Sequence, residues 1–132
     1  MSELREQIKE TIETEPVVAF IKGSHQQAFC GNSERAMQAL RGVGATFTAV
    51  DVLPDPQIRH ELSALSSWPT IPQVFVGGEL LGGADIVQEL AASGDLERKL
   101  VEKLGDAWRG AGEERTVALG GAGGAGRFRL AR

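Results

Sequence analysis

The sequence predicts an α/β domain with a small mixed sheet, and two observations lead to this fold class. Short apolar or β-branched segments alternate with segments whose apolar residues recur every three or four positions, as in strands alternating with amphipathic helices. Near the end of this pattern, two short apolar segments flank a Gly-Gly pair, which indicates an antiparallel hairpin. With 132 residues and 42% hydrophobic content, the chain is long enough for one domain with its own core.

The first half of the pattern contains two helices and two strands. Apolar residues four positions apart predict a helix over residues 2–14, which ends before Pro16. Residues 17–21 are continuously apolar and predict a strand buried on both faces. Helical spacing returns over residues 32–41, and a segment rich in β-branched residues predicts a strand over residues 46–52.

The second half adds three helices and the hairpin. One helix begins at Asp55-Pro56, because proline suits the first helical turn. The hairpin strands cover residues 73–76 and 79–81. Helical spacing then predicts a helix over residues 85–92 and a last one from residue 95 onward.

The resulting order, α-β-α-β-α-β-β-α-α, is that of the thioredoxin-like fold, with a four-stranded mixed sheet flanked by helices. We assign this domain to residues 1–109. Residues 110–132 are rich in glycine and alanine and end in basic residues. Such a chain buries too little apolar surface to offset its conformational entropy, so we predict a disordered tail. The alternative is a basic terminus that contacts a partner or an anionic surface.

Composition and charge exclude several classes of function. A net charge of -4 gives the chain no electrostatic footprint for nucleic acid. A single cysteine argues against a disulfide-built secreted scaffold and suits a reducing compartment. The polar N-terminus is unlike a signal peptide, and the longest apolar run is too short to span a bilayer. We therefore expect a soluble, cytoplasmic protein without a nucleic-acid or membrane partner.

Cys30 is the only thiol of the chain and stands in the tetrapeptide Cys-Gly-Asn-Ser, between a strand and a helix. A thiolate is both the nucleophile and the metal ligand, so a lowered pKa is what would make Cys30 functional. The helix N-terminus and the nearby Lys22 would lower it, and the Ser33 hydroxyl would hydrogen-bond the sulfur. The alternative is a buried structural thiol. We expect His25, in the preceding loop, to be a solvated residue rather than a metal ligand.

Two further segments have the residue types of a binding site. Trp-Pro-Thr-Ile-Pro-Gln at residues 68–73 places Pro72 in a tight turn, with a cis peptide bond as one possibility, at the entrance of a strand. The backbone of Ile71 would then be free to pair with an extended, peptide-like ligand, the alternative being an ordinary rigid turn. Asp85 begins a helix, where it would either cap the helix or bind the ammonium group of a ligand.

Together these segments resemble the monothiol glutaredoxins, whose signature is Cys-Gly-Phe-Ser, and in particular their short bacterial single-domain form. The resemblance covers about residues 1–108 and rests on residues 20–23, 30–33, 51–53, 68–73, 78–85 and 89–90. It implies a protein that binds glutathione. It also implies a homodimer that shares a [2Fe–2S] cluster and passes it between iron–sulfur donor and recipient proteins.

The resemblance also implies a role for individual residues. Cys30 would be the reactive thiol and the cluster ligand. The implied glutathione contacts are Lys22 and Arg59 at the glycyl carboxylate, Ile71 at the cysteinyl backbone, and Ala84 and Asp85 at the γ-glutamyl end. A [2Fe–2S] cluster takes four thiolates, and one cysteine from each of two chains plus two glutathione thiolates supplies four.

The chain departs from the family pattern at two positions, and other functions stay open. Asn32 replaces the signature phenylalanine, which would let water reach a cluster or add a hydrogen bond that changes its potential. Ala84 stands where the family often has cysteine or serine. The Asn32 substitution favours an alternative, a glutathione-dependent thiol–disulfide oxidoreductase acting through Cys30. A third possibility is an adaptor that uses this surface only for protein contacts. Retention of Lys22, Arg59 and Asp85 argues against it.

Overall fold

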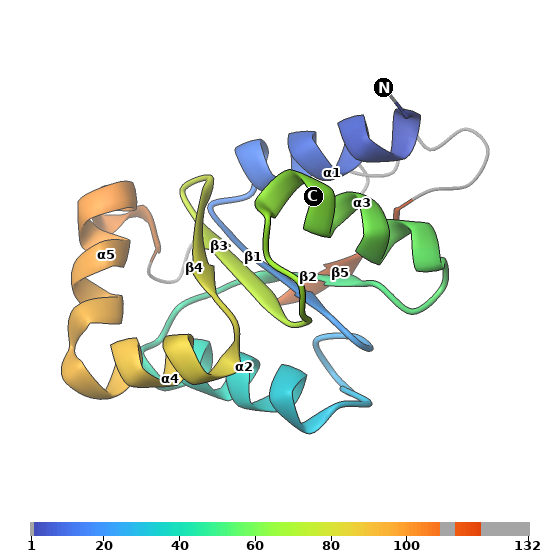
Figure 1. Ribbon diagram of the computed structural model, residues 1–132. Coiled ribbons are helices and arrows are strands. Elements are labelled where there is room, and N and C mark those ends of the chain that lie inside the picture. Colours follow the sequence, from blue (N-terminus) through green and yellow to red (C-terminus); the bar gives the residue numbers. More distant parts are fainter. Residues whose placement is uncertain (1, 109–112, 120–132) are drawn as a thin grey trace.

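The computed structural model describes residues 2–108 and 113–119, which form a mixed five-stranded sheet with helices on both faces (Figure 1). This is the α/β arrangement that the sequence predicts. The elements are α1 (Glu3–Thr14), β1 (Val17–Ile21), α2 (Gly31–Gly42), β2 (Thr48–Asp51), α3 (Pro56–Ser66), β3 (Gln73–Val76), β4 (Glu79–Gly82), α4 (Ala84–Ser93), α5 (Asp95–Leu104), a short 3-10 helix (Gly105–Trp108) and β5 (Arg115–Val117).

The strand β1 lies at the centre of the sheet, whose order is β4-β3-β1-β2-β5. It pairs in parallel with β2 and antiparallel with β3, and all five of its residues are buried, as its apolar sequence predicts. The predicted hairpin joins β3 to β4. Both of its turn glycines, Gly77 and Gly78, have positive φ angles, of 57° and 84°. Glycine adopts a positive φ without a steric cost, which explains why a Gly-Gly pair predicts this hairpin turn.

Two apolar clusters hold the helices on opposite faces of the sheet. One cluster joins the sheet to α2, α4 and α5 through buried side chains such as Met37, Val87 and Leu100. The other joins it to α1 and α3 through Ile8, Ile58 and Leu62, with the Phe20 and Phe75 rings in edge-to-face contact. Figure 1 shows α1 and α3 together on one side of the sheet and α2 and α4 on the other. Cys30 therefore lies at the start of a helix anchored in the first cluster.

The sheet has one strand more than the sequence analysis predicts. Residues 115–117, which we assigned to a disordered tail, form β5 and pair in parallel with β2 from Thr48 to Val50. That part of the assignment is wrong, because Val117 is buried against the second cluster and two neighbouring charges are paired. Residues 110–112 and 120–132 of the predicted tail, and residue 109 of the predicted domain, lie outside the described residues.

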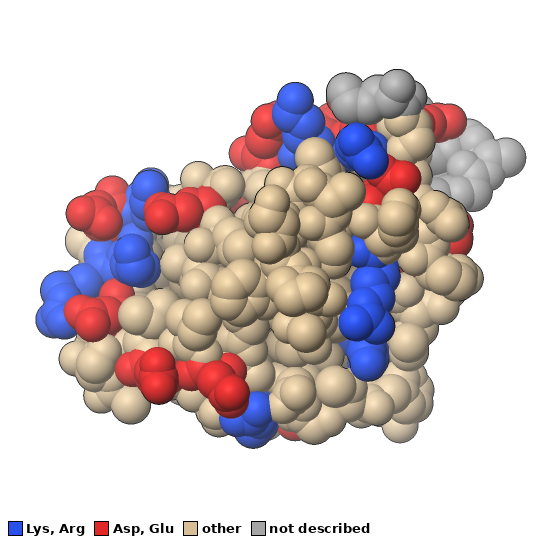
Figure 2. Space-filling view, in the orientation of Figure 1, with Lys and Arg blue, Asp and Glu red and all other residues tan. Residues whose placement is uncertain are grey.

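Charged side chains are unevenly distributed over the face of the molecule shown in Figure 2. On the face shown in Figure 2, acidic and basic side chains gather over α1 and α5, and much of the area between them carries no charge. Both signs of charge occur side by side at these margins. Within the described residues, no helix is both long and apolar enough to cross a bilayer.

Candidate functional site

The thiol of Cys30 lies at the N-terminus of α2, as predicted. Cys30 is the N-cap residue, with extended backbone angles of φ -147° and ψ 129°, and its carbonyl accepts the hydrogen bond from the Glu34 N–H at 3.0 Å. The N–H groups of the first helical turn have no partner within the helix and point toward the cap. The half-buried Cys30 is therefore set among backbone donors, and the buried-thiol alternative does not describe it.

These donors lower the pKa of the Cys30 thiol below its ordinary value. The largest cause is the hydrogen bond from the backbone N–H of Ser33, followed in the same direction by the Asn32 N–H, the Ser33 hydroxyl and the charge of Lys22. Partial burial acts against them and raises the pKa, but the donors outweigh it. Thiolate is favoured at the position where a nucleophile or a metal ligand needs it.

Ser33 ties this helix start to the end of β1. Its side chain is fully buried, and its oxygen accepts a hydrogen bond from the Lys22 N–H at 3.1 Å. Lys22 in turn offers its carbonyl to the N–H of Phe29 at 2.8 Å, which closes the loop in front of Cys30. Asp51, at the end of β2, accepts from the Gly23 N–H at 2.9 Å and holds the same loop from the other side. The loop is thus fixed to two adjacent strands.

The turn before β3 contains a cis peptide bond between Ile71 and Pro72. The side-chain amide of Gln73 donates to the carbonyls of Trp68 and Thr70, at 2.9 and 3.2 Å, and so holds the turn from inside. The ladder between β1 and β3 ends at Gln73, so Ile71 lies outside it, as predicted. Its side chain is buried, which fixes the direction of its backbone.

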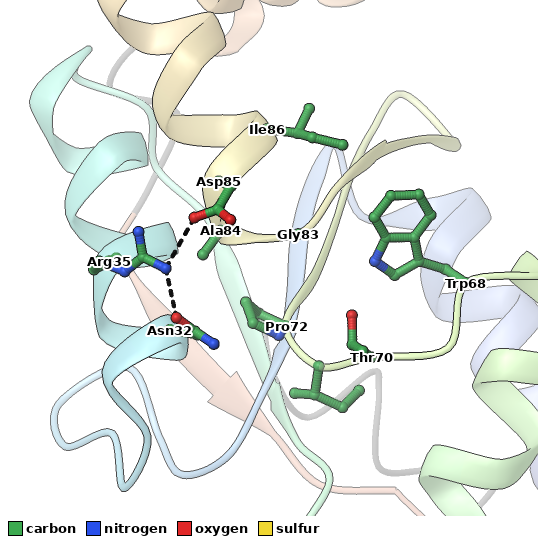
Figure 3. A pocket seen from close by; sticks show the side chains of 10 residues that line it. Asn32, Arg35, Trp68, Thr70, Pro72, Gly83, Ala84, Asp85 and Ile86 are labelled. Atoms are coloured by element: carbon green, nitrogen blue, oxygen red, sulfur yellow. Dashed lines mark hydrogen bonds and ion pairs between the residues drawn. The ribbon is translucent and has the colours of Figure 1, made fainter.

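A pocket of about 280 Å³ lies between this turn and the starts of α2 and α4 (Figure 3). Its lining residues are Asn32, Arg35, Trp68, Thr70, Ile71, Pro72, Gly83, Ala84, Asp85 and Ile86. Gly83 packs closely against the turn: a Cβ there would come within 3.3 Å of the Pro72 carbonyl oxygen. A side chain at this N-cap of α4 would therefore crowd the turn that lines the pocket.

Three of the predicted site residues, Ile71, Ala84 and Asp85, line this pocket. Asp85 does not cap its helix: the N-cap is Gly83, and no side chain caps α4. Its carboxylate is instead largely exposed and forms an ion pair with Arg35 at 3.0 Å. Figure 3 shows the carboxylate turned toward the Arg35 guanidinium, so the capping alternative for Asp85 is wrong.

Arg35 and Ile86 are the pocket residues that the sequence analysis missed, and Arg35 is the charged one. Its guanidinium donates to Asn32 Oδ1 and to Gln88 Oε1, each at 2.5 Å, in addition to the ion pair with Asp85. The available signal was its position three residues after Asn32, because residues three apart share one face of a helix. Its partners on α4 could not be foreseen, because only the packing of α2 against α4 brings them together.

Three predicted site residues, Cys30, Lys22 and Arg59, lie outside the pocket lining. Lys22 directly follows β1 and is half-buried, with its charge near enough to Cys30 to affect the pKa of the thiol. Arg59 is exposed on α3 and does not line the pocket. The structure therefore joins Lys22 to Cys30 electrostatically and places Arg59 outside the pocket lining.

The loop before Cys30 is also held by β5. The backbone N–H of His25 donates to the Thr116 hydroxyl at 2.8 Å, and its ring Nδ1 lies 2.7 Å from the same oxygen. Arg41 donates to the His25 carbonyl at 2.6 Å and pairs with Glu114 at 2.9 Å. His25 is therefore bound to the sheet edge and not simply solvated, which corrects our expectation. In the described residues, no group of three or more His, Cys, Asp or Glu side chains is placed to hold a metal ion.

A thioredoxin-like sheet with a single activated cysteine at a helix N-terminus defines a class of thiol protein that acts without a second cysteine of its own. The comparisons with known proteins identify the family within this class. The glutaredoxin family profile matches residues 17–81. Glutaredoxin 4 of Escherichia coli K12 is 43% identical over 102 residues, which are 77% of this chain and 89% of that protein. The chain belongs to the glutaredoxin family.

The relatives include proteins named as monothiol glutaredoxins. Monothiol glutaredoxin-S17 of Arabidopsis thaliana is 41% identical over 99 residues, which are 75% of this chain and only 20% of that protein. The chain thus spans a small part of this longer relative and most of the bacterial one. This confirms the resemblance to monothiol glutaredoxins, including the short bacterial form.

Solved structures confirm the fold. A monomeric truncated mutant of Trypanosoma brucei 1-C-Grx1 superposes with a TM-score of 0.69 at 40% identity, covering 78% of this chain and 94% of that one. A buckwheat glutaredoxin solved as a complex with glutathione gives a TM-score of 0.66 at 25% identity, with 75% and 88% covered. The thioredoxin-like α/β fold is therefore shown, with β5 as the addition to the predicted four strands.

Proposed function

We propose that this protein is a cytoplasmic monothiol glutaredoxin that binds glutathione beside Cys30 and carries a [2Fe–2S] cluster between two chains. The observation that carries the proposal is the activated Cys30 thiol at the start of the same helix that lines the pocket. The glutathione-bound buckwheat relative supports the choice of ligand. The proposed role is to accept a cluster from a donor protein and pass it to a recipient.

The pocket offers groups that match the parts of glutathione. The backbone of Ile71, outside the ladder, would pair with the cysteinyl residue of the tripeptide. The N-terminus of α4 and the Asp85 carboxylate would take the γ-glutamyl end, which carries a carboxylate and an ammonium group. Lys22 and Arg59 would attract the glycyl carboxylate from outside the lining. This arrangement would direct the glutathione sulfur toward Cys30, which lies outside the lining at the N-cap of α2.

The cluster would be the cargo of the protein and not a resident group. The residues fit it because one cysteine with a lowered pKa supplies one thiolate, and the other three come from a second chain and two glutathione molecules. The dimer would be held largely by these shared bonds, so it would separate when the cluster leaves. Asn32 lies two positions after Cys30 in the sequence and is exposed. It would therefore bring a polar amide near the cluster.

The test is anaerobic reconstitution of the full chain with iron, sulfide and glutathione, followed by absorption and circular dichroism spectra and size-exclusion chromatography. We expect visible cluster bands in a dimer that reverts to a monomer when glutathione is removed. Cys30→Ser should give neither bands nor dimer, whereas Ser63→Ala, on α3, serves as the matched control and should give both. A colourless monomer from the unaltered chain would contradict the carrier function.

The lowered pKa of Cys30 also supports a second candidate, glutathione-dependent thiol–disulfide exchange. The Cys30 thiolate would attack the glutathione sulfur of a glutathionylated protein, form a Cys30–glutathione disulfide and release the protein thiolate, which takes up a proton. A second glutathione thiolate would then attack the glutathione sulfur of that disulfide, releasing oxidised glutathione and restoring the Cys30 thiolate. Release of glutathione from a glutathionylated protein by the colourless monomer would favour this reaction over cluster transfer.

A further inference from the structure

We infer that Arg35 is a carboxylate-binding residue of the pocket, and that it recognises the α-carboxylate of the γ-glutamyl group while Asp85 takes the α-ammonium. This inference rests on the proposed glutathione binding and adds a residue and a specificity to it. The observation that suggests it is a fixed pair of opposite charges at the wall of the pocket, one on α2 and one on α4 (Figure 3).

The guanidinium of Arg35 is held in place before any ligand arrives. Nη2 donates to Asn32 Oδ1 and Nη1 donates to Gln88 Oε1, so the group is anchored to both helices. With the Nη2–Asp85 ion pair, these contacts occupy three of the five N–H groups of an arginine, which leaves two donors for a ligand. The side chain is 42% exposed, so a ligand in the pocket can reach it. An arginine held in this way loses little freedom on binding, and its planar fork matches a carboxylate.

The neighbouring groups fit the other half of an α-amino acid. Asp85 is 85% exposed and lies 3.0 Å from Nη2 of Arg35, so an anionic and a cationic partner are presented together. A free α-amino acid end carries its ammonium and its carboxylate on one carbon, and its two charges are therefore as close together as the charges of this pair. The N-terminus of α4, whose first turn contains Asp85, adds backbone N–H groups that also attract a carboxylate. A lone carboxylate or a lone amine would satisfy only half of this arrangement.

The inference also gives Asn32 a role. Its amide oxygen accepts the hydrogen bond that orients Arg35, and the phenylalanine of the family signature has no such acceptor. Asn32 is therefore a positioning residue, which acts on the ligand through Arg35. The departure from the signature would then strengthen recognition of the γ-glutamyl end.

The experiment is calorimetric titration of the reduced full chain, without iron, at constant ionic strength. The ligands are glutathione and γ-aminobutyryl-cysteinylglycine, which lacks only the α-carboxylate. We expect the unaltered protein to bind glutathione about tenfold more tightly than the analogue, as for the loss of one charged hydrogen-bonded pair. Arg35→Ala should remove this preference by weakening glutathione alone, and Arg98→Ala, an arginine of α5 outside the pocket, is the matched control.

Variants of Asn32 distinguish its positioning of Arg35 from a general effect on folding. Asn32→Phe should reduce the preference for glutathione over the analogue, and Asn32→Asp, which keeps an acceptor oxygen, should retain it. If Arg35→Ala weakens both ligands equally, leaves both unchanged or strengthens glutathione binding, the assignment of Arg35 is wrong. If glutathione binding depends on Asp85 but not on Arg35, only this inference fails. If the unaltered chain binds no glutathione, the proposed function fails with it.

Discussion

At the scale of single residues, the chemistry of this site depends on which donors face one sulfur atom. The Ser33 N–H is the main cause of the lowered pKa of Cys30, and the Ser33 hydroxyl acts in the same direction. The same hydroxyl oxygen accepts from the Lys22 N–H, so one buried serine serves both the thiol and the strand end. In a two-cysteine redox protein this position carries the resolving cysteine, and here it carries a hydrogen-bonding group instead.

We predict that Ser33→Ala raises the pKa of Cys30 and destabilises the fold. Loss of the hydroxyl removes one donor to the thiolate, while the backbone N–H groups remain. Because alkylation requires the thiolate, its rate rises with pH, and the half-maximal rate should move to higher pH in the variant. The Lys22 N–H would lose its acceptor, at a cost of about 1–3 kcal/mol in the free energy of unfolding.

Ser63→Ala is the control for this measurement. The Ser63 hydroxyl is buried on α3 and has no hydrogen-bond partner among the described residues. Its loss should change neither the pH profile of alkylation nor the stability by a comparable amount. An alkylation profile for Ser33→Ala that coincides with that of the unaltered chain would refute the role of the hydroxyl.

At the scale of secondary-structure elements, β5 is the main difference between the predicted and the observed fold, because it adds a fifth strand to the sheet. It covers the edge of β2, and the residues around it connect elements far apart in sequence. Arg115 pairs with Glu15 after α1, Glu114 pairs with Arg41 on α2, and Thr116 binds His25 in the loop before Cys30. This short strand therefore links the edge of the sheet to the loop that carries the site.

We predict that a chain ending at residue 112 is less stable than one ending at residue 119 by about 2–4 kcal/mol. The estimate combines burial of the Val117 side chain with two partly exposed ion pairs. Urea unfolding of the two chains measures the difference. Equal midpoints would mean that β5 adds nothing to the sheet. Thr116→Val in the full chain tests the contact with His25 separately, since it removes the hydroxyl but keeps the shape.

At the scale of the whole molecule, the pocket exists because three separated segments converge at one end of the sheet. The turn before β3, the start of α2 and the start of α4 each supply part of the lining. The packing of α2 against α4 sets the distance between Arg35 and Asp85, and the apolar cluster around Met37 and Val87 sets that packing. A ligand that fills this pocket contacts all three segments and so stabilises the fold as a unit.

We predict that glutathione raises the thermal midpoint of the full chain in a concentration-dependent way. At one hundred times Kd, binding to the folded state alone adds about 2.7 kcal/mol to the free energy of unfolding. Differential scanning calorimetry at fixed ionic strength measures the shift, and Asp85→Asn should reduce it at equal glutathione concentration. The same shift in both proteins would place the ligand outside this pocket.

Much of this site was predictable from the sequence because its signals are local. A proline before a strand, a cysteine before a helix and a Gly-Gly pair each restrict the backbone within a few residues, and all three were found where predicted. β5 was not predictable, because its three residues have no periodicity and lie beside glycine-rich chain. Its stability comes from contacts with residues such as Glu15 and His25, about a hundred positions earlier.

The sequence by itself determined the order of elements from α1 to α5, the place of Cys30 and the family, since these depend on spacing and residue type along the chain. The tertiary structure alone decided that Asp85 pairs with Arg35 instead of capping α4, and that His25 is bound to β5. The physical reason is that a charge or a hydrogen-bonding group chooses its partner by distance in space. That distance is set by how the helices pack on the sheet and not by their separation in sequence.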